Sequence, residues 1–409
     1  MNKTITFILF VLSFAFLLND RGHATGITIT DTIDATADNT LYEDAEGLLS
    51  NGFGEYLFAG STNNGFKKRG LIFFDIQYRI PPGAVINDVK VRMYMSRTIS
   101  GNTPVELYKV DNKYWSEGTS DAFGEEGSGA TAEMYDATWL HNNYSSEFWL
   151  NPGGDYVPTI TASTDVNSIG YYEWSSAQMI NDVNSWINFD LNNFGWIIIS
   201  DETSSPTTKR FNSTQNPNLE TRPKLIINYT INSPSLIFSA MTEGLYHGNK
   251  GSYVYYDSLR VFLKNSFPPY STVDSVFKMH AFLSGISFPN ASAGSYYIAL
   301  KHRNSIETWS NVPKLFTIGS AVTHYFTNND SLAYGNNLIF EEGFYCIYSG
   351  DVDQNGIIDG SDAGLIDNDI ANFTTGYFAS DLDGNLVTDG TDGAICDNNV
   401  YNFVTKIVP

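Results

Sequence analysis

The chain has 409 residues, which is long for one domain, and its 45 acidic residues against 23 lysines and arginines give a formal net charge of −22. Binding to phosphate depends on clustered lysine and arginine, so this composition argues against a nucleic-acid-binding protein and favours cationic or neutral polar ligands. Two cysteines exclude a disulfide-framework protein, and short runs of Tyr, Thr, Val and Ile between turn residues are typical of a mainly β chain.

Residues 1–24 have the pattern of a signal peptide. Lys3 precedes the apolar run FILFVLSFAFLL, and the small residues Gly22 and Ala24 flank His23. This pattern predicts cleavage near Thr25 and a secreted, extracellular chain that is either free or associated with the cell surface. No later apolar run reaches the roughly eighteen residues of a membrane span, so no span is predicted.

Residues 25–230 are predicted to form a jelly-roll-like β-sandwich. Turn residues such as Pro152-Gly153-Gly154 separate the strand-like runs. One helix is expected in SSAQMINDVNSWIN, where Met179, Val183 and Trp186 recur at helical spacing. Two stacked sheets with this helix at one end are the natural way to bury such strands. The strand-like runs are 55–60, 69–76, 89–97, 105–110, 194–200 and 223–230.

Six of the seven tryptophans fall in this segment, and three of them lie in or beside a long loop rich in Gly, Glu and Asn. Sugar rings pack their flat C–H faces on aromatic rings, while polar side chains satisfy the hydroxyl groups. The alternative is that the tryptophans are buried and pin the loop onto the sandwich. The candidate carbohydrate-binding residues are Trp115, Trp139, His141, Tyr144 and Trp149.

The same loop also carries the acidic residues that a glycosidase would need. Glu125, Glu126, Asp136 and Asp155 have the chemistry of an acid/base pair, but their separation in space cannot be read from the sequence. Nothing in the chain resembles a serine or cysteine triad, a zinc HExxH motif or a phosphate-binding loop. We therefore expect a non-catalytic protein.

Several stretches of this segment together resemble a DNRLRE-type domain. They include DNTLYED (38–44), FGWIIISDE (194–202), and residues 49–76, 115–156 and 209–229. The resemblance implies a β-sandwich similar to a class of carbohydrate-binding modules, found in secreted bacterial proteins beside polysaccharide-active enzymes. Polysaccharide is accordingly the expected partner of residues 25–230.

Residues 231–349 are predicted to form a second, smaller β-sandwich of the immunoglobulin or prealbumin kind. The segment opens at Asn232-Ser233-Pro234, which has the composition of a linker, and continues with runs such as SLIFSAM and NLIFEEGFYCIYSG. Lys301, His302 and Arg303 form either a polar site or an exposed strand edge. No chemistry is evident, and a spacer role is expected.

Residues 350–409 contain a repeat. DVDQNGIIDGSD (351–362) and DLDGNLVTDGTD (381–392) align without a gap at a spacing of thirty. Ca²⁺ takes six to eight oxygen ligands, and twelve-residue loops supply them from positions 1, 3, 5, 7, 9 and 12, position 7 through a backbone carbonyl. Two calcium ions are therefore the predicted cofactors. The predicted ligands are Asp351, Asp353, Asn355, Ile357, Asp359 and Asp362 in the first loop and Asp381, Asp383, Asn385, Val387, Asp389 and Asp392 in the second.

Position 6 of each loop makes a sharp turn that suits glycine. The first loop has Gly356 there, but the second has Leu386, so the second site is expected to be weaker or distorted. A short helix is predicted after each loop, because Leu365, Ile366, Ile370 and Phe373, and likewise Ile395, Cys396, Val400 and Phe403, recur at helical spacing.

This duplicated loop-then-helix unit, with Asp at position 12 and no entering helix, resembles the dockerin type I module. The resemblance implies a small helical module that docks onto a cohesin-like protein partner, and the stretch YYIALKHRNSIETWS (296–310) looks like sandwich modules that adjoin such repeats. The alternatives are a self-contained cap packed on residues 231–349 and an acidic, partly disordered tail.

The two cysteines are the last open question from the sequence. Cys396 replaces the core-facing Ile366 of the other repeat, which predicts a buried thiol, and a Cys346–Cys396 bridge is the alternative.

Together the segments predict a secreted, non-catalytic, modular protein that binds polysaccharide and docks, or is stabilised, through a calcium-dependent C-terminus. The alternative is a structural or adhesive cell-surface protein in which both sandwiches are spacers and calcium stiffens the C-terminus.

Overall fold

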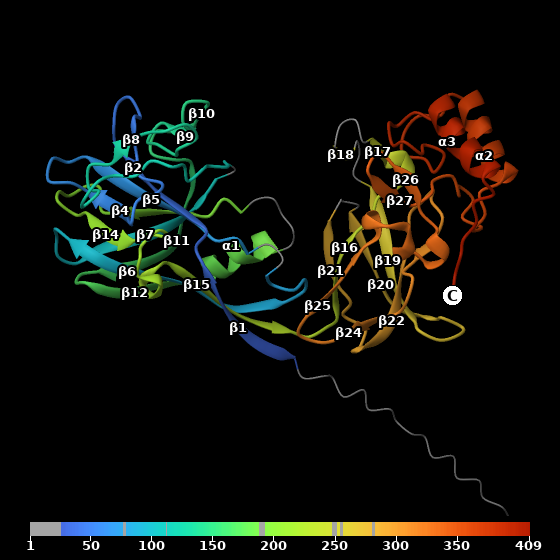
Figure 1. The fold of residues 1–409 in the computed structure, drawn as a ribbon, viewed down its shortest axis with the longest axis horizontal. Coiled ribbons are helices and arrows are strands. Elements are labelled where there is room, and N and C mark those ends of the chain that lie inside the picture. Colours follow the sequence, from blue (N-terminus) through green and yellow to red (C-terminus); the bar gives the residue numbers. More distant parts are fainter. Residues whose placement is uncertain are drawn as a thin grey trace, which may run out of the picture.

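The computed structural model describes residues 26–76, 79–111, 113–187, 193–247, 252–253, 257–279 and 283–409. The predicted signal peptide lies outside the described residues. The described chain is mainly β, with three α-helices, as predicted from the sequence. A β-rich lobe built from residues up to Ile231 stands beside a second β-rich lobe, and the C-terminal helices lie on the second lobe (Figure 1). None of the described helices has the length and hydropathy that a membrane crossing requires.

The first lobe, which corresponds to the predicted first sandwich, is one curled sheet whose two halves face each other. Its strands follow the order β1-β15-β6-β14-β4-β5-β13-β7-β11, and β12 and β2 pair with β6 and β5. Strand β4 pairs with both β14 and β5, so it joins the two halves. The elements are β1 (Ile27–Asp34), β2 (Ala37–Tyr42), β3 (Leu49–Ser50), β4 (Tyr56–Ser61), β5 (Lys67–Phe73), β6 (Val85–Thr98), β7 (Thr103–Val110), β8 (Ala130–Thr131), β9 (His141–Asn143), β10 (Glu147–Phe148), β11 (Tyr156–Val166), β12 (Gly170–Ser175), α1 (Ala177–Ile187), β13 (Trp196–Ser200), β14 (Lys209–Asn212) and β15 (Lys224–Ile231).

Strand β13 shows how this lobe is layered. Side chains alternate between the two faces of a strand, and Trp196 and Ile198 point into the core between the sheet halves. Ile197 and Ile199 point to the opposite face, where the loop of residues 113–155 covers them. Because both faces are buried, the strand is apolar throughout and not alternating in polarity. Helix α1 packs Met179, Val183 and Trp186 against the first core, which is the face that its sequence predicted.

The second lobe packs a three-stranded sheet, β21-β16-β25, against a sheet in the order β20-β19-β22-β23, with β24 also on β22. Strands β16 and β25 are parallel, and the other pairs in these two sheets are antiparallel. The elements are β16 (Ser235–Ser239), β17 (Tyr246–His247), β18 (Ser252–Tyr253), β19 (Ser258–Asn265), β20 (Thr272–Met279), β21 (Ser284–Ser287), β22 (Gly294–Lys301), β23 (Thr308–Trp309), β24 (Lys314–Phe316), β25 (Ala321–Tyr325), β26 (Ile339–Glu341), β27 (Phe344–Cys346), α2 (Gly360–Ala371) and α3 (Gly390–Tyr401).

One hydrophobic core runs through the second lobe and into the C-terminal repeats. Leu263 of β19 and Ile298 of β22 belong to the same cluster of buried side chains as Ile366 of α2 and Cys396 of α3, all with no exposed surface. Leu382, from the second acidic loop, is buried in it as well. The core therefore continues across the predicted boundary at residue 350, and the repeats are seated on the sandwich.

Candidate calcium loops and a surface hollow

Each acidic loop brings three carboxylates together. Oxygens of Asp351, Asp353 and Asp362 lie within 4.8 Å of one another, and the oxygens of Asp381, Asp383 and Asp392 do the same in the second loop. These are positions 1, 3 and 12 of the predicted ligand pattern. Three anionic oxygens at such separations repel one another unless protons or a cation lie among them.

The position-12 carboxylate organises each loop through the backbone. Asp362 Oδ1 accepts hydrogen bonds from the backbone N–H of Val352 (2.8 Å) and Asp353 (3.1 Å), and Oδ2 accepts one from Asp359 (3.0 Å). Asp392 makes the same three bonds in the second loop, at 2.6, 3.1 and 2.8 Å. The loop thus folds around the carboxylate that begins the following helix.

The side chains at positions 5 and 9 lie outside these carboxylate triads. Asp359 caps α2 by accepting from Ser361 N at 2.7 Å, and Asp389 caps α3 in the same way. The position-5 amides, Asn355 and Asn385, donate to the neighbouring Asp353 and Asp383 at 2.8 and 3.0 Å. Ile357 and Val387, the predicted carbonyl donors at position 7, form isolated β-bridges with Thr405 and Thr375.

Position 6 adopts the left-handed conformation in both loops. Gly356 has φ of 90°, and Leu386 has φ of 68°, which costs a non-glycine residue about 1–2 kcal/mol. The second loop thus keeps the shape of the first despite its leucine. Whether the second site is weaker stays a prediction.

Three carboxylates of the two loops have a raised pKa, as expected where anionic oxygens are buried close together. Burial, followed by the charges of Asp362 and Asp353, raises the pKa of Asp351 to about 6. Burial also raises the pKa of Asp381 and Asp392. Asp381 Oδ1 is buried and has no hydrogen-bond partner, and the Arg303 guanidinium stands 3.9 Å from its other oxygen. An all-oxygen donor set with an unfilled anionic oxygen fits a hard cation such as Ca²⁺.

Polar contacts fix the second loop to the sandwich. Asn304 Nδ2 donates to the Asp381 carbonyl at 3.0 Å, and Asn304 Oδ1 lies 2.8 Å from His302 Nδ1. Asp257 lies 3.1 Å from His302 Nε2 and 2.7 Å from Arg303 Nε, and it accepts from the Tyr377 hydroxyl at 2.5 Å. Lys301, His302 and Arg303 are therefore more than a strand edge, because two of the three hold this buried network.

Both cysteines are free and buried. Cys396 lies in the shared core, as predicted, and burial raises its thiol pKa to about 12. Cys346 lies in a separate small cluster with Met241 and Tyr246, so the bridge considered from the sequence is not formed.

The three candidate tryptophans of the first sandwich are buried. Trp115, Trp139 and Trp149 are 5–6% exposed and belong to the cluster that covers the outer face of β13. Trp115 Nε1 donates to the Phe194 carbonyl at 2.8 Å, and Trp149 Nε1 donates to the Thr138 carbonyl at 2.9 Å. These contacts fit the alternative reading, in which the tryptophans pin the loop.

The other two candidate carbohydrate residues pack on each other. His141 is 7% exposed, and the Tyr144 ring stacks edge-on against it at 5.1 Å between centroids. The half-buried Tyr144 is the more accessible of the two.

The four acidic residues considered for catalysis bind neighbouring groups. Glu125 forms ion pairs with two arginines, and Glu126 accepts from the backbone N–H of Glu55 and Tyr56. Asp136 accepts from Thr119 N and Glu133 N, and Asp155 accepts from Leu150 N and Asn151 N. Each carboxylate therefore holds a loop in place.

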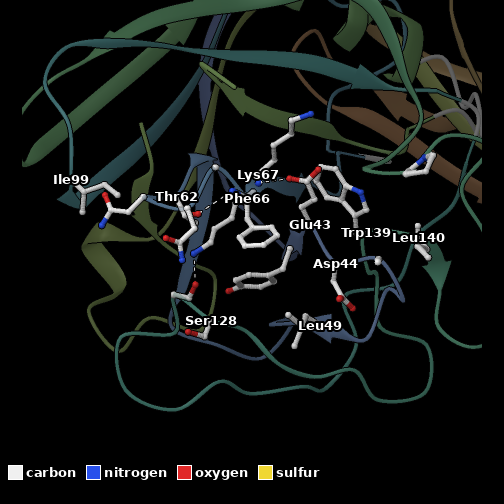
Figure 2. Close-up of a pocket in the computed structure, with 18 residues that line it drawn as sticks. Glu43, Asp44, Leu49, Thr62, Phe66, Lys67, Ile99, Ser128, Trp139 and Leu140 are labelled. Carbon is white, nitrogen blue, oxygen red and sulfur yellow. Dashed lines mark hydrogen bonds between the residues drawn. The ribbon is translucent and has the colours of Figure 1, made fainter. Parts of the chain in front are cut away.

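A hollow of about 1110 Å³ opens between the turn at residues 62–67 and the loop that carries Trp139. Phe66, 57% exposed, stands in the middle of it, with Thr62 and Ile99 on one side and Trp139 and Leu140 on the other (Figure 2). The polar lining residues include Glu43, Asp44, Asn63, Asn64, Lys67 and Lys68.

Lys68 is a buried cation at the edge of the hollow. Its side chain is 6% exposed, its ammonium donates to the Gly127 carbonyl, and it stands 4.7–5.2 Å from the ring centres of Phe58 and Tyr42. Burial lowers its pKa to about 8. Of the five predicted carbohydrate residues, only Trp139 lines this hollow. In the sequence, STNNGFKKRG places Phe66 beside two lysines, and this is the pattern that could have pointed to the hollow.

No known protein family matches the sequence, and no curated protein matches it. Two solved structures are similar to part of the chain, an N-terminal and a C-terminal interface mutant of a type II cohesin–X-dockerin complex from Acetivibrio cellulolyticus. They are 14% and 10% identical to this chain, with TM-scores of 0.28 and 0.27. Each alignment covers 41% of this chain and 94% of the other. A likeness this weak establishes nothing about what this chain binds.

Proposed function

We propose that this chain is a secreted, non-catalytic, modular protein whose C-terminal repeats bind two calcium ions and present a calcium-organised, dockerin-like surface to a protein partner. The observation that carries the proposal is the pair of carboxylate triads, 351/353/362 and 381/383/392, each folded around its position-12 aspartate. The first sandwich, in this proposal, binds a polysaccharide.

The calcium part of the proposal follows from charge. Asp351, Asp353 and Asp362 would hold one ion and Asp381, Asp383 and Asp392 the other, with the carbonyls of Ile357 and Val387 within the same loops. A bound divalent cation supplies the positive charge that lets three carboxylates stay ionised and close together. The three carboxylates come together only when the repeats are folded against the shared core. Calcium that binds this folded state alone should therefore stabilise the folded repeats.

A metal titration tests this part. Calorimetric titration of the full chain should detect two calcium ions bound by the C-terminal repeats, and the double substitution of Asp353 and Asp383 by Ala should remove both of these repeat sites. Substituting Asp367 and Asp397 by Ala removes the same charge from exposed positions of α2 and α3 and should leave both sites intact. Absence of calcium uptake by the parent chain would refute the proposal.

The saccharide part rests on the hollow around Phe66. An exposed aromatic ring beside amide, carboxylate and ammonium groups has the mixture of surfaces that sugar rings and their hydroxyls require. A glycan array should show selective binding by the full chain. Phe66→Ala should weaken that binding about tenfold, since an aromatic contact of this size is worth up to about 1.5 kcal/mol.

Phe277→Ala is the matched control for the array, because Phe277 is 66% exposed on β20 of the other lobe. Release of reducing sugar from polysaccharides would contradict the non-catalytic assignment. Binding without any saccharide preference, unchanged in Phe66→Ala, would favour a structural or adhesive protein instead.

One observation favours that second candidate for the C-terminus. The repeats share their core with the second sandwich, so calcium bound in the repeats would also stiffen the lobe on which they sit. Pull-down from the producing cell's secreted proteins, with and without chelator, separates the two roles. A partner captured only in calcium supports docking, and the absence of any captured protein supports stiffening alone.

A further inference from the structure

Two carboxylates meet under a turn of the first sandwich, far from the C-terminal loops. Asp38 lies on β2, and Glu117 lies in the long loop after β7. Both bind Thr214: its N–H donates to Asp38 Oδ2 at 2.5 Å, and its hydroxyl donates to Glu117 Oε1 at 3.3 Å. Asp38 N also donates to Glu117 Oε1, at 2.8 Å. The two acidic side chains therefore lie within a few ångströms of each other.

The Asp38 carboxylate is incompletely satisfied. Asp38 is 1% exposed, and its Oδ1 is buried with no hydrogen-bond partner. Within the described ranges only one other carboxylate has such an oxygen, and that is Asp381 in the second acidic loop. No described lysine or arginine forms an ion pair with Asp38 or Glu117. An ionised carboxylate in this position is costly unless a cation faces it.

A second hollow, of about 630 Å³, lies next to the pair. Thr214 and Gln215 line it, together with the acidic residues Glu55, Asp121 and Glu126 and the basic residue Arg222. Glu117 is half-buried, whereas Asp38 is enclosed. Gln215 Nε2 donates to Glu117 Oε1 at 2.9 Å, which holds the glutamate in place.

We propose that Asp38 and Glu117 bind a hard divalent cation, calcium or magnesium, at the end of the first sandwich. Asp38 Oδ1 and the free side of the Glu117 carboxylate are its protein ligands, and water completes the shell, as it does for Mg²⁺ bound through one or two carboxylates. The cation ties β2 to the loop before β8. This site does not depend on the C-terminal repeats.

The test uses the full chain with the C-terminal loops disabled by the double substitution Asp353→Ala and Asp383→Ala. Calorimetric titration of this background with calcium, and separately with magnesium, should reveal one remaining site. Adding Asp38→Asn, which keeps the acceptor for Thr214 N, should lower the affinity at least about tenfold. Asp34→Asn, an exposed carboxylate on β1, is the control and should leave it unchanged.

Thermal unfolding supplies an independent readout. The cation should raise the melting temperature of the background chain and of Asp34→Asn but not of Asp38→Asn. If Asp38→Asn does not fold, Glu117→Gln should show the same loss of binding. A background that binds neither metal overturns the proposal, even if the native chain binds two calcium ions through its C-terminus. So does an Asp38→Asn chain that is more stable than its parent in both metal and chelator, because Asp38 would then be a neutral buried acid.

Discussion

Replacing Gly244 by Ala probes how tightly the C-terminal repeats are seated on the second sandwich. Gly244 lies in the turn before β17, and a Cβ added to it would stand 2.3 Å from the Leu382 carbonyl oxygen and 2.8 Å from the carbonyl carbon. A carbon and an oxygen in contact stand roughly 3.3 Å apart, so the two backbones must separate by about 1 Å. Overpacking of this kind costs about 1–3 kcal/mol. Both sides of the clash are backbone, and we expect the upper end of that range.

The same substitution should weaken calcium binding by the second loop. Leu382 stands between two predicted ligands, Asp381 and Asp383, and is buried in the shared core. The clash costs roughly 3 kcal/mol in the closed loop that binds calcium. If opening of the loop relieves about half of this cost, the closed loop is disfavoured and its calcium affinity falls about tenfold. Scanning calorimetry in calcium measures the stability, and calorimetric titration measures the two affinities separately.

Gly364→Ala is the control, because an added Cβ there meets nothing within 4 Å on the surface of α2. It should stabilise the unit by about 0.5–1 kcal/mol, through the better helix propensity of alanine. A Gly244→Ala variant with an unfolding free energy within about 0.5 kcal/mol of the parent, and with both calcium affinities unchanged, would show that this contact does not seat the repeats.

Three further predictions concern other parts of the chain. Gly356→Leu should lower the calcium affinity of the first loop about tenfold in a calorimetric titration, because a left-handed leucine costs about 1–2 kcal/mol; equal affinity would count against the assigned turn. Burial raises the pKa of Glu243 from 4.5 to about 7, so its ionisation opposes folding and stability should fall as the pH rises through that interval. Glu243→Gln should flatten this decline in urea midpoints measured across the interval, and an unchanged profile would mean that other groups cause the decline. Trp149→Ala should cost the first sandwich about 3–5 kcal/mol in urea unfolding, as expected for a buried pin; a stable variant with altered saccharide binding would restore the ligand reading.

Local sequence patterns predicted much of the fold. Each of the six strand-like runs of the first sandwich contains a strand, and the helical spacing of Met179, Val183 and Trp186 marks the buried face of α1. The thirty-residue repeat placed both loops and both helices, because ligand spacing and the capping aspartate are local in sequence. Such features need no knowledge of distant contacts.

The helix faces were less well predicted. Phe373 and Phe403 continue the helical spacing, yet they are 87% and 86% exposed. Both follow the last helical turn with φ of 53° and 54°, so the backbone leaves the helix before their side chains can join its buried face. Spacing alone does not reveal where a helix stops when the residue after the cap is not glycine.

Contacts between residues far apart in sequence could not be read from the chain. Tryptophans in a polar loop are compatible with sugar binding or with burial, and only the position of the loop over Ile197 and Ile199 decides between them. Asp38 and Glu117 are unremarkable until the fold brings them to Thr214. The core shared by the second sandwich and the repeats likewise depends on tertiary packing that periodicity does not encode.

Backbone hydrogen bonds hold each loop closed, and the positions of their partners in the chain set the order in which the two loops can form. Ile358 N donates to the Val404 carbonyl at 2.9 Å, and Lys406 N donates to the Gly356 carbonyl at 2.7 Å, so residues after α3 complete the first loop. The second loop is closed earlier in the chain, by Thr374 and Gly376. During synthesis the downstream loop can therefore close first, and the upstream one must wait until residue 406 has emerged. A tag or truncation near residue 406 would therefore disturb the first loop, which lies at the start of the repeats.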